Sequence, residues 1–337
     1  MLIALALTLP AHAITLSLVE RSTPFTGVTV EEYRTSNPTT DVWAAYVDLC
    51  AAGVRVDATS TPTSLRSASA WADAVGADVA INGDFYKSGP VRVYGRAIGS
   101  GVPWPDIQTG VDSGYSWEWF YEKYGWIALG HDRVDFTHTE WTKDNTAVLG
   151  GWQPNTVAAA PPLGTLALVS GFPEVVTEGV AVTCTSPTAS DCFPDRSDMQ
   201  ARHPRSAMGL TQDGETLMLV AADGRTSRAS GLYGAELADL MHQLGAWQAF
   251  NLDGGGSTQL WVRGEGTINN ATGNNGGGSL RGVANHIGVF ASGAGRPAHC
   301  PTQASCGVVP AGGGTIDDDD ACFDLFGDPD YWRSESS

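Results

Sequence analysis

Positive charge is scarce in this chain. Its 19 Lys and Arg residues face 37 Asp and Glu residues, which gives a formal net charge of −18 at pH 7. Such an acidic surface repels nucleic acid and anionic lipid, so neither is expected as a partner. Long apolar runs are also absent, because no segment reaches the roughly 18 unbroken apolar residues that would span a membrane. We therefore expect no membrane insertion, and an anionic substrate would have to be bound by local arginines.

Several motifs for metal binding and catalysis are missing. No C-x-x-C spacing occurs, which argues against a cysteine-based zinc site. There is no G-x-x-x-x-G-K-[ST] and no H-E-x-x-H, which excludes a P-loop and a common zinc-protease site. Ser257 stands in Gly-Gly-Gly-Ser-Thr, not in the G-x-S-x-G turn of serine hydrolases. We predict no metal site and no required cofactor, although the aspartates could hold a divalent cation.

The N-terminus and the cysteines indicate export. Residues 1–13 are mainly apolar and end in Ala-His-Ala, which is typical of a signal peptide cleaved after Ala13. Six cysteines suit an oxidising compartment. We predict a secreted or extracytoplasmic protein in which Cys184 pairs with Cys192. The pairing of the remaining four cysteines stays open: Cys50, Cys300, Cys306 and Cys322.

Hydrophobic periodicity predicts strands and two helices within residues 14–292. Leu237, Leu240, Met241 and Leu244 follow helical spacing, and Gly245 ends that helix. A second helix is expected over residues 65–75. Strands are expected over residues 28–34, 42–48, 54–58, 79–82, 206–210, 216–222, 247–252, 259–263 and 285–291. Because the two kinds of element do not alternate strictly, we predict a single α+β domain with a mixed, largely antiparallel twisted β-sheet core flanked by helices.

The composition changes after residue 292. Gly, Pro, Ala and Cys dominate up to Ile316, which is typical of a linker, and four aspartates follow at 317–320. The acidic run is interpreted as a solvated segment; calcium binding is the alternative. Cys322, Phe323, Tyr331 and Trp332 then suggest that residues 293–337 comprise a linker and the start of a further extracellular module.

A triple-glycine loop joins two of the predicted strands. Asn251 and Asp253 end the first strand, and Gly254, Gly255, Gly256 and Ser257 lead into the next. Three glycines in a row suggest positive φ angles or a close approach of the backbone to a ligand. Backbone N–H groups beside a carboxylate and a hydroxyl could cradle a phosphate or a sugar. The alternative is a simple hairpin turn, for which Asp-Gly is a common signal.

Three predicted strands end in an aspartate beside glycine: Asp84, Asp223 and Asp253. Strand ends present functional side chains on a rigid scaffold, so we expect these carboxylates to converge. Five candidate cations lie near the same ends: Arg202, His203, Arg205, Arg225 and Arg281. Guanidinium groups can contact two phosphate oxygens at once, while a carboxyl group protonates a leaving oxygen or activates water. The alternative is that each Asp-Gly is a turn and each arginine a surface ion pair.

These motifs, in this order, resemble the phosphodiester glycosidase family. The resemblance covers roughly residues 25–292, and its glycine-rich segment with the preceding helix is specific. It implies a secreted hydrolase that cleaves the bond between the anomeric carbon of a sugar and a phosphodiester. A Trp-rich insert near residues 103–162 departs from the pattern and puts the identity of the sugar in doubt. The matching segments are 82–86, 203–209, 223–225, 231–232, 235–238, 245–246, 251–258 and 281–289.

Roles are assigned to the matching residues as hypotheses. Asp253 is the expected catalytic carboxylate, with Asp84, Asp223 and Glu236 as candidates for the second acid/base role, and Glu236 could equally brace the loop. Arg205 and Arg281 are the expected phosphate clamps. The remaining residues are expected to bind substrate or orient the carboxylates: Asn82, Asn251, His203, Arg225, Gly254, Gly255, Gly256 and Ser257.

Two other functions compete with the hydrolase. One is a non-catalytic extracellular glycan-binding module, in which aromatic side chains around residues 115–126 hold the ligand. The other is a glycoside hydrolase that acts on unphosphorylated glycans. The expected partner is in each case a carbohydrate, and the sequence identifies no protein partner.

Overall fold

The computed structural model describes residues 14–61, 64–105, 111–112, 115–116, 124–137, 141–143, 152–154, 160–189, 193, 196–270 and 280–301. Several predicted features lie outside these residues. They are the signal peptide, the acidic run and further module at the C-terminus, Cys192, Cys306, Cys322 and most of the aromatic stretch 115–121.

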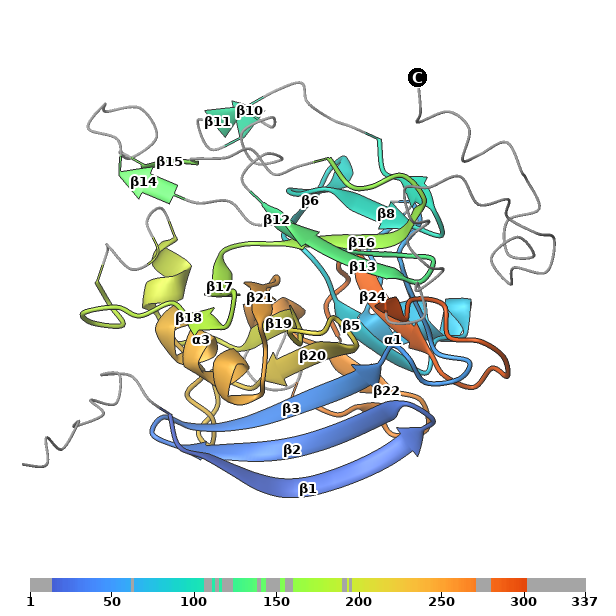
Figure 1. The fold of residues 1–337 in the computed structure, drawn as a ribbon. Helices are drawn as coiled ribbons and strands as arrows, with labels where there is room; N and C mark the ends of the chain where they lie inside the picture. The colour runs from blue at the N-terminus through green and yellow to red at the C-terminus, as the bar shows by residue number, and fades with distance from the viewer. Residues whose placement is uncertain are drawn as a thin grey trace, which may run out of the picture.

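The largest sheet has eight antiparallel strands and forms the lower layer of the molecule in Figure 1. Its order is β1-β2-β3-β20-β19-β21-β17-β18, so a hairpin from the C-terminal half extends an N-terminal three-stranded meander. The bounds are β1 Leu16–Phe25, β2 Val28–Ser36, β3 Thr39–Asp48, β17 Glu174–Thr177, β18 Val180–Ala181, β19 Arg205–Leu210, β20 Thr216–Ala222 and β21 Gln248–Asn251.

Two five-stranded sheets lie above it. The first has the order β23-β22-β5-β24-β4 and the second β13-β12-β16-β8-β9. The first contains β4 Arg55–Ala58, β5 Val79–Asn82, β22 Leu260–Val262, β23 Gly266–Thr267 and β24 His286–Phe290. The second contains β8 Ala97–Gly99, β9 Val102–Pro103, β12 Gly125–Gly130, β13 Arg133–Thr137 and β16 Thr165–Gly171. Three hairpins complete the set: β6 Tyr86–Ser88 with β7 Val91–Val93, β10 Val111–Asp112 with β11 Tyr115–Ser116, and β14 Trp141–Lys143 with β15 Trp152–Pro154.

The sheets are antiparallel, as predicted, but the helical content is lower than an α+β fold implies. Among the described residues the α-helices are α1 (Ala68–Val75) and α3 (Gly234–Gln243). Every named strand pair in those residues is antiparallel, so the expected mixed sheet is not found there. The fold is therefore largely β, and its layers are mainly sheets packed on sheets.

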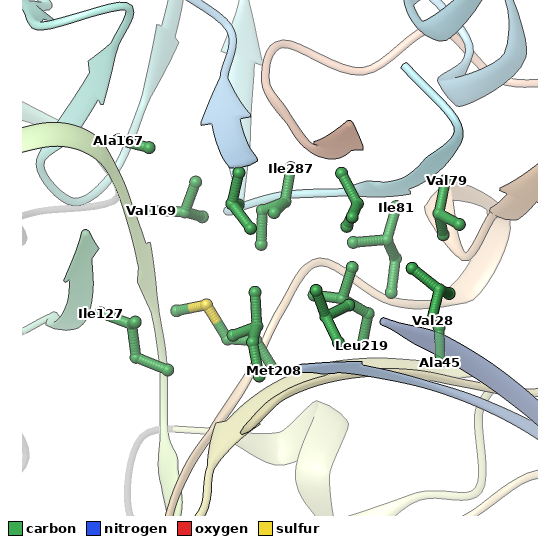
Figure 2. Packing of buried hydrophobic residues seen from close by; sticks show 14 of the residues in the cluster. Val28, Ala45, Val79, Ile81, Ile127, Ala167, Val169, Met208, Leu219 and Ile287 are labelled. Carbon is green, nitrogen blue, oxygen red and sulfur yellow. The ribbon is translucent and has the colours of Figure 1, made fainter. Parts of the chain in front are cut away.

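Both faces of the large sheet are buried at its central strands β19 and β20, and successive residues of each strand point to opposite faces. In β20, Leu217 and Leu219 face the central core, whereas Met218 and Val220 face the cluster that includes α3. The central core lies where the three sheets meet, with Ile127 from one small sheet and Ile81 from the other, as Figure 2 shows. The second cluster contains all four residues of the predicted helical stripe: Leu237, Leu240, Met241 and Leu244.

Several predicted elements are confirmed. The strand at 79–82 has the predicted bounds, and residues 206–210 pair with 217–221 in the predicted hairpin. Helix α1 starts at Ala68, later than expected, because the Ser67 hydroxyl accepts a hydrogen bond from Ala70 N (3.2 Å) and caps the helix there. The long strand β1 was not predicted, and its outer residues are largely exposed.

A disulfide joins Cys50 to Cys300, which resolves part of the pairing that the sequence left open. It connects the turn after β3 to the segment after β24 across 250 residues. Cys184 is also disulfide-bonded, and its pairing with Cys192 remains a prediction. In the part of the chain that the structure describes, no helix has the length and apolar character needed to cross a bilayer.

Candidate active site

Asn82 ties three strand ends together at the edge of the sheets. Its side chain donates to Asp253 O (2.6 Å) and accepts from Ser206 Oγ (2.7 Å) and Gln259 N (3.1 Å). The backbone adds a hydrogen bond from Asp253 N to Gly83 O (3.0 Å). Because Asn82 is fully buried, it orients the backbone of Asp253. The predicted alternative, a contact with a sugar hydroxyl, does not fit this placement.

Asp253 is the carboxylate that reaches the surface of this junction. Its residue is partly exposed, in contrast to its buried neighbours Leu252 and Ser257. Burial raises the pKa of the Asp253 carboxyl to about 6, while the Ser257 hydroxyl and the positive charges of Arg281 and Arg196 lower it. A group with this pKa exchanges its proton near neutral pH, as acid–base catalysis requires.

Asp84 lies close enough to Asp253 for the two charges to interact. Burial raises its pKa well above the ordinary value, and the Asp253 carboxylate raises it further, against hydrogen bonds from backbone N–H groups. These hydrogen bonds come from Phe85 N and Gly95 N, each at 2.7 Å. Asp84 is only 1% exposed. The structure thus brings Asp84 and Asp253 together but leaves only Asp253 facing outward.

Arg196 is a site residue that the sequence analysis missed. Its charge acts on both Asp84 and Asp253, and it forms a two-point ion pair with Asp198 at 2.8 and 2.9 Å. Its guanidinium lies 4.4 Å from the ring centre of Phe85 and 5.1 Å from that of Phe172. It stands in an irregular segment before a short 3₁₀ turn, so no periodic pattern pointed to it. The acidic residues beside Arg196 in the sequence were the only feature that could have indicated a charged site there.

Aromatic rings line the interior side of this charge cluster. Tyr124 packs against Tyr94 (6.2 Å between ring centres), Phe172 (5.1 Å) and Phe85 (6.5 Å). Tyr124 is 4% exposed, so among the predicted aromatic platform residues it belongs to the wall beneath the site. Most of that predicted platform lies outside the described residues.

Arg281 is the exposed cation of the cluster. Its charge lowers the pKa of Asp253 and of Tyr86. Burial raises the pKa of Tyr86, and the Asp253 charge raises it further; the Tyr86 hydroxyl donates to Gly282 O (2.8 Å). Arg281 therefore has the exposure and the position predicted for a phosphate-binding residue.

The glycine loop is shaped by close approach within the protein. A Cβ on Gly254 would lie 2.8 Å from Pro204 O, and Gly255 has φ +60° with the Arg225 guanidinium 3.1 Å from where its Cβ would be. Gly255 through Ser257 form a 3₁₀ turn. Arg225 also lies 3.0 Å from His203 Nδ1. These contacts bring Arg225 and His203 to the loop, as predicted.

Arg205 requires a correction. It is 2% exposed, and its guanidinium donates to Leu232 O (3.0 Å), Ala201 O (2.9 Å) and Asp198 O (2.7 Å). Burial lowers its pKa to about 10. A guanidinium whose donors are used inside the protein cannot serve as a phosphate clamp, so Arg205 instead fixes the segment that leads into α3 to the segment around 198–201.

Glu236 and Asp223 also differ from the catalytic roles expected. Glu236 accepts from Tyr233 N (2.9 Å) and Arg202 Nη2 (2.6 Å), so it caps α3 and braces the loop. Asp223 accepts from Asn270 N (2.8 Å). Burial raises its pKa to about 7, and the charges that raise it further are those of Asp41 and Glu32. The expected group of three carboxylates is therefore reduced to the pair Asp84 and Asp253.

Some buried polar atoms near the junction have no aligned hydrogen bond among the described residues. They are Asn251 Oδ1, both side-chain polar atoms of Asn285, and Ser257 Oγ, which still lies close enough to Asp253 to lower its pKa. The Asn251 amide donates to Phe172 O (3.0 Å). The Asn285 side chain lies against the Gly83 backbone; it was part of a matching segment but had no predicted role. Unpaired buried acceptors and donors of this kind are suited to bind ligand or water.

The described residues contain no group of three or more His, Cys, Asp or Glu side chains placed to hold a metal ion. The charge of Arg196 acts on both Asp84 and Asp253, and that of Arg281 acts on Asp253.

Residues 75–290 match the family model of phosphodiester glycosidases. A curated relative, the SPbeta prophage-derived uncharacterized protein YomE of Bacillus subtilis (strain 168), is 43% identical over 74 residues. That match covers 22% of this chain and 11% of YomE, so the chain corresponds to a small part of that relative.

Solved structures share the fold at low identity. A hypothetical protein from Synechocystis is 16% identical with a TM-score of 0.54, over 83% of this chain and 68% of that one. A Burkholderia pseudomallei protein whose name calls it exported is 13% identical with a TM-score of 0.55, over 84% and 98%. The catalytic domain of zebrafish N-acetylglucosamine-1-phosphodiester alpha-N-acetylglucosaminidase, auto-inhibited by its pro-peptide, is 14% identical with a TM-score of 0.52, over 82% and 88%.

Proposed function

The chain belongs to the phosphodiester glycosidase family, and from this premise we propose that it hydrolyses the bond between the anomeric carbon of a sugar and a phosphodiester. The observation that carries the proposal is the partly exposed Asp253 carboxyl, with its pKa near 6, between the buried Asp84 and the exposed Arg281. This arrangement supplies a base that titrates near neutral pH and a cation for an anionic substrate.

Asp253 acts as the general base in this proposal. A water molecule attacks the anomeric carbon and gives its proton to the Asp253 carboxylate. The bond between the anomeric carbon and the phosphate oxygen breaks, and its electron pair leaves on the phosphate. The products are the free sugar and a phosphate monoester, so atoms and charges balance.

The leaving group makes a second catalytic acid unnecessary. A phosphate oxygen leaves as a weakly basic anion, whereas the alkoxide of an ordinary glycoside must be protonated as it leaves. Asp84 has both oxygens engaged by backbone N–H groups, which suits a positioning role. The nearby Asp253 carboxylate raises the pKa of Asp84, because a second negative charge at this site is costly.

Arg281 holds the phosphate in this proposal, with Arg225 as a further donor. The expected donors of the glycine loop are largely engaged, because Gly255 N donates to Pro204 O (2.9 Å), Ser257 N donates to Gly254 O (3.1 Å) and Gly254 N donates to the Asp253 carboxylate. Arg196 is engaged with Asp198 and acts on the carboxyl pair from the interior. The revised assignment thus keeps Arg281 as a phosphate contact and replaces Arg205 by Arg225.

Hydrolysis in ¹⁸O-labelled water tests the reaction directly. The substrates are a methyl phosphodiester of glucose 1-phosphate and a nucleotide sugar. Attack at the anomeric carbon places the label in the released sugar. A label found only in the phosphate product would show phosphorus–oxygen cleavage and would refute the proposal.

Variants separate the proposed enzyme from the two alternatives. Asp253→Asn should abolish release of sugar while ligand binding persists; full activity in this variant would remove Asp253 from the mechanism. Arg281→Gln should weaken kcat/KM on the phosphodiester about 100-fold and change hydrolysis of a neutral glycoside little, because a charge-assisted contact contributes about 3 kcal/mol. Arg228→Gln, at an exposed arginine, is the matched control.

Binding without turnover on every substrate would instead favour a glycan-binding module.

We also propose export, and we place the end of the catalytic domain after residue 301, later than the predicted boundary at residue 292. The Cys50–Cys300 disulfide supports an oxidising compartment, and the mainly apolar residues 1–13 supply the signal peptide. His299 is fully buried and its ring is hydrogen-bonded to Val56 N (3.1 Å) and Gly130 O (2.7 Å), and Cys300 is bonded to Cys50, which supports a catalytic domain that includes residues 293–301. The proposed linker and the start of a further module then follow residue 301. N-terminal sequencing of protein from the culture medium should begin at Ile14; retention of residues 1–13 would contradict the cleavage.

A further inference from the structure

A second polar pocket lies between β4, α1 and β24, with a volume of about 440 Å³. Ser60, Thr61, Ser64 and Arg66 form its outer part, and Trp71 and Phe290 belong to its apolar wall. The mechanism above uses none of these six residues. Thr61, Ser64 and Arg66 are exposed, so the pocket is open to solvent.

This pocket and the carboxyl pair are on opposite sides of one chain segment. Ala284 and His286 line the pocket, while the side chain of Asn285 between them lies against Gly83 at the candidate active site. Ala284 is at a bend and β24 begins at His286, so the chain changes direction between the two pocket residues. A ligand in the pocket would therefore bind apart from Asp253.

The inner part of the pocket is preformed and uncharged. His286 stacks on Trp71, with 5.0 Å between ring centres and 10° between planes. The ring nitrogens of His286 are engaged by Thr59 Oγ1 and Arg66 O, each at 3.0 Å. Burial lowers the pKa of His286 to about 4, so the ring is neutral at physiological pH.

The single carboxylate of the pocket is already neutralised. Asp57 accepts from Ser100 N (2.7 Å), Ser100 Oγ (2.8 Å) and Ala58 N (2.8 Å). It also pairs with Arg55 (3.2 Å), whose guanidinium lies over Phe290. Asp57 and Arg55 together leave no net charge and form a fixed part of the wall.

The groups that remain available are hydrogen-bond donors. Within the described ranges, the Arg66 guanidinium has no hydrogen-bond or ion-pair partner, and neither do the hydroxyls of Ser60, Thr61 and Ser64. An unpaired arginine at a pocket is notable in a chain of net charge −18. Guanidinium and hydroxyl groups are the donors that phosphate oxygens accept from.

We propose that this pocket binds a sugar phosphate, with Arg66, Ser60 and Ser64 holding the phosphate and the sugar lying along the apolar wall. The accessible apolar side chain of this wall is Val75, which is 45% exposed, whereas Trp71 is 5% exposed and stacked on His286. Apolar side chains favour the C–H faces of a sugar ring. The inference does not depend on the reaction at Asp253, because it concerns binding alone.

The test follows the Nε–Hε resonance of Arg66 in ¹⁵N spectra of the full chain, assigned by its loss in Arg66→Gln. The probes are inorganic phosphate, glucose 1-phosphate and glucose. Saturable shifts are expected with the first two, with tighter binding of glucose 1-phosphate, and no shift with glucose. A response to glucose equal to that of glucose 1-phosphate, or an unmoved Arg66 resonance, would overturn the proposal.

A second measurement follows the indole N–H resonance of Trp71 in the variants. Arg66→Gln should bind glucose 1-phosphate at least tenfold more weakly, since it loses a charged hydrogen bond. Arg228→Gln removes an exposed arginine that does not line the pocket and should bind like the wild type. Equal loss in both variants would indicate a general charge effect and no specific site. Neither readout requires turnover, so loss of hydrolysis would not affect them.

Discussion

Replacing Asp253 by Asn should remove activity and stabilise the protein at neutral pH. The Asp253 carboxyl has an ordinary pKa of 3.8, which burial in the folded state raises to about 6. The folded form therefore holds this proton more tightly than the unfolded chain. Its contribution to stability is full below pH 3.8 and is lost as the pH rises through 6.

The size of the effect follows from the pKa difference. A shift of about two units corresponds to roughly 3 kcal/mol at 1.4 kcal/mol per unit. Asn carries no charge at any pH and so avoids this cost. We expect the free energy of unfolding of Asp253→Asn to exceed that of the wild type by up to about 3 kcal/mol at pH 7.5, with the difference falling below pH 6.

Urea unfolding of both proteins between pH 4 and 8 measures this difference. Asp213→Asn is the control, because hydrogen bonds from Thr211 and Glu215 lower the pKa of Asp213 and its replacement should not stabilise the protein. If the difference between Asp253→Asn and the wild type were independent of pH, the carboxyl would not be desolvated as described, and the argument for its basicity would fail.

Two further variants test the corrected roles. Arg205→Lys should lower the free energy of unfolding by about 2–3 kcal/mol, because lysine cannot donate to the carbonyls of Leu232, Asp198 and Ala201 together. The KM for the phosphodiester should change little. A large rise in KM at unchanged stability would restore Arg205 as a phosphate clamp. Glu236→Ala should cost about 1 kcal/mol in urea unfolding, because it removes the acceptor that caps α3 at Tyr233 N, and should leave kcat within a factor of about two. Loss of kcat without loss of stability would return Glu236 to the catalytic group.

Local patterns predicted much of the framework. The helical stripe from Leu237 to Leu244 packs as expected, and the 206–222 hairpin has the predicted pairing. These features depend on periodicity within short segments. The assembly of three sheets around one core depends on side chains from distant segments, such as Ile81 and Ile127, that share this core, and no local pattern encodes it.

Part of the site was predicted from the sequence. The predictions that were wrong concern the direction in which side chains point. Arg205 directly precedes the predicted strand 206–210. In β19 its side chain is on the same face as that of Ala207, which packs in the cluster around α3. That alternation could have indicated that Arg205 points inward. Glu236 caps its helix through Tyr233, which is outside the usual Ser/Thr capping pattern. Arg196 lies in a segment without periodicity, so only the folded structure brings it to the carboxyls.

Because the phosphate leaving group needs no proton in the proposed mechanism, we predict that kcat/KM rises with pH in a single step and does not fall again. For a pKa of about 6, about one tenth of the Asp253 carboxyl is ionised at pH 5 and about nine tenths at pH 7. If Asp253 alone must ionise, kcat/KM on the phosphodiester should therefore rise about tenfold over this range and then stay level to about pH 8.5. Removal of the Arg281 charge should move the midpoint upward, since that charge lowers the pKa of Asp253; the matched Arg228→Gln variant should leave it in place. A bell-shaped profile in the wild type would mean that a second group must donate a proton, and the single-base mechanism would then be wrong.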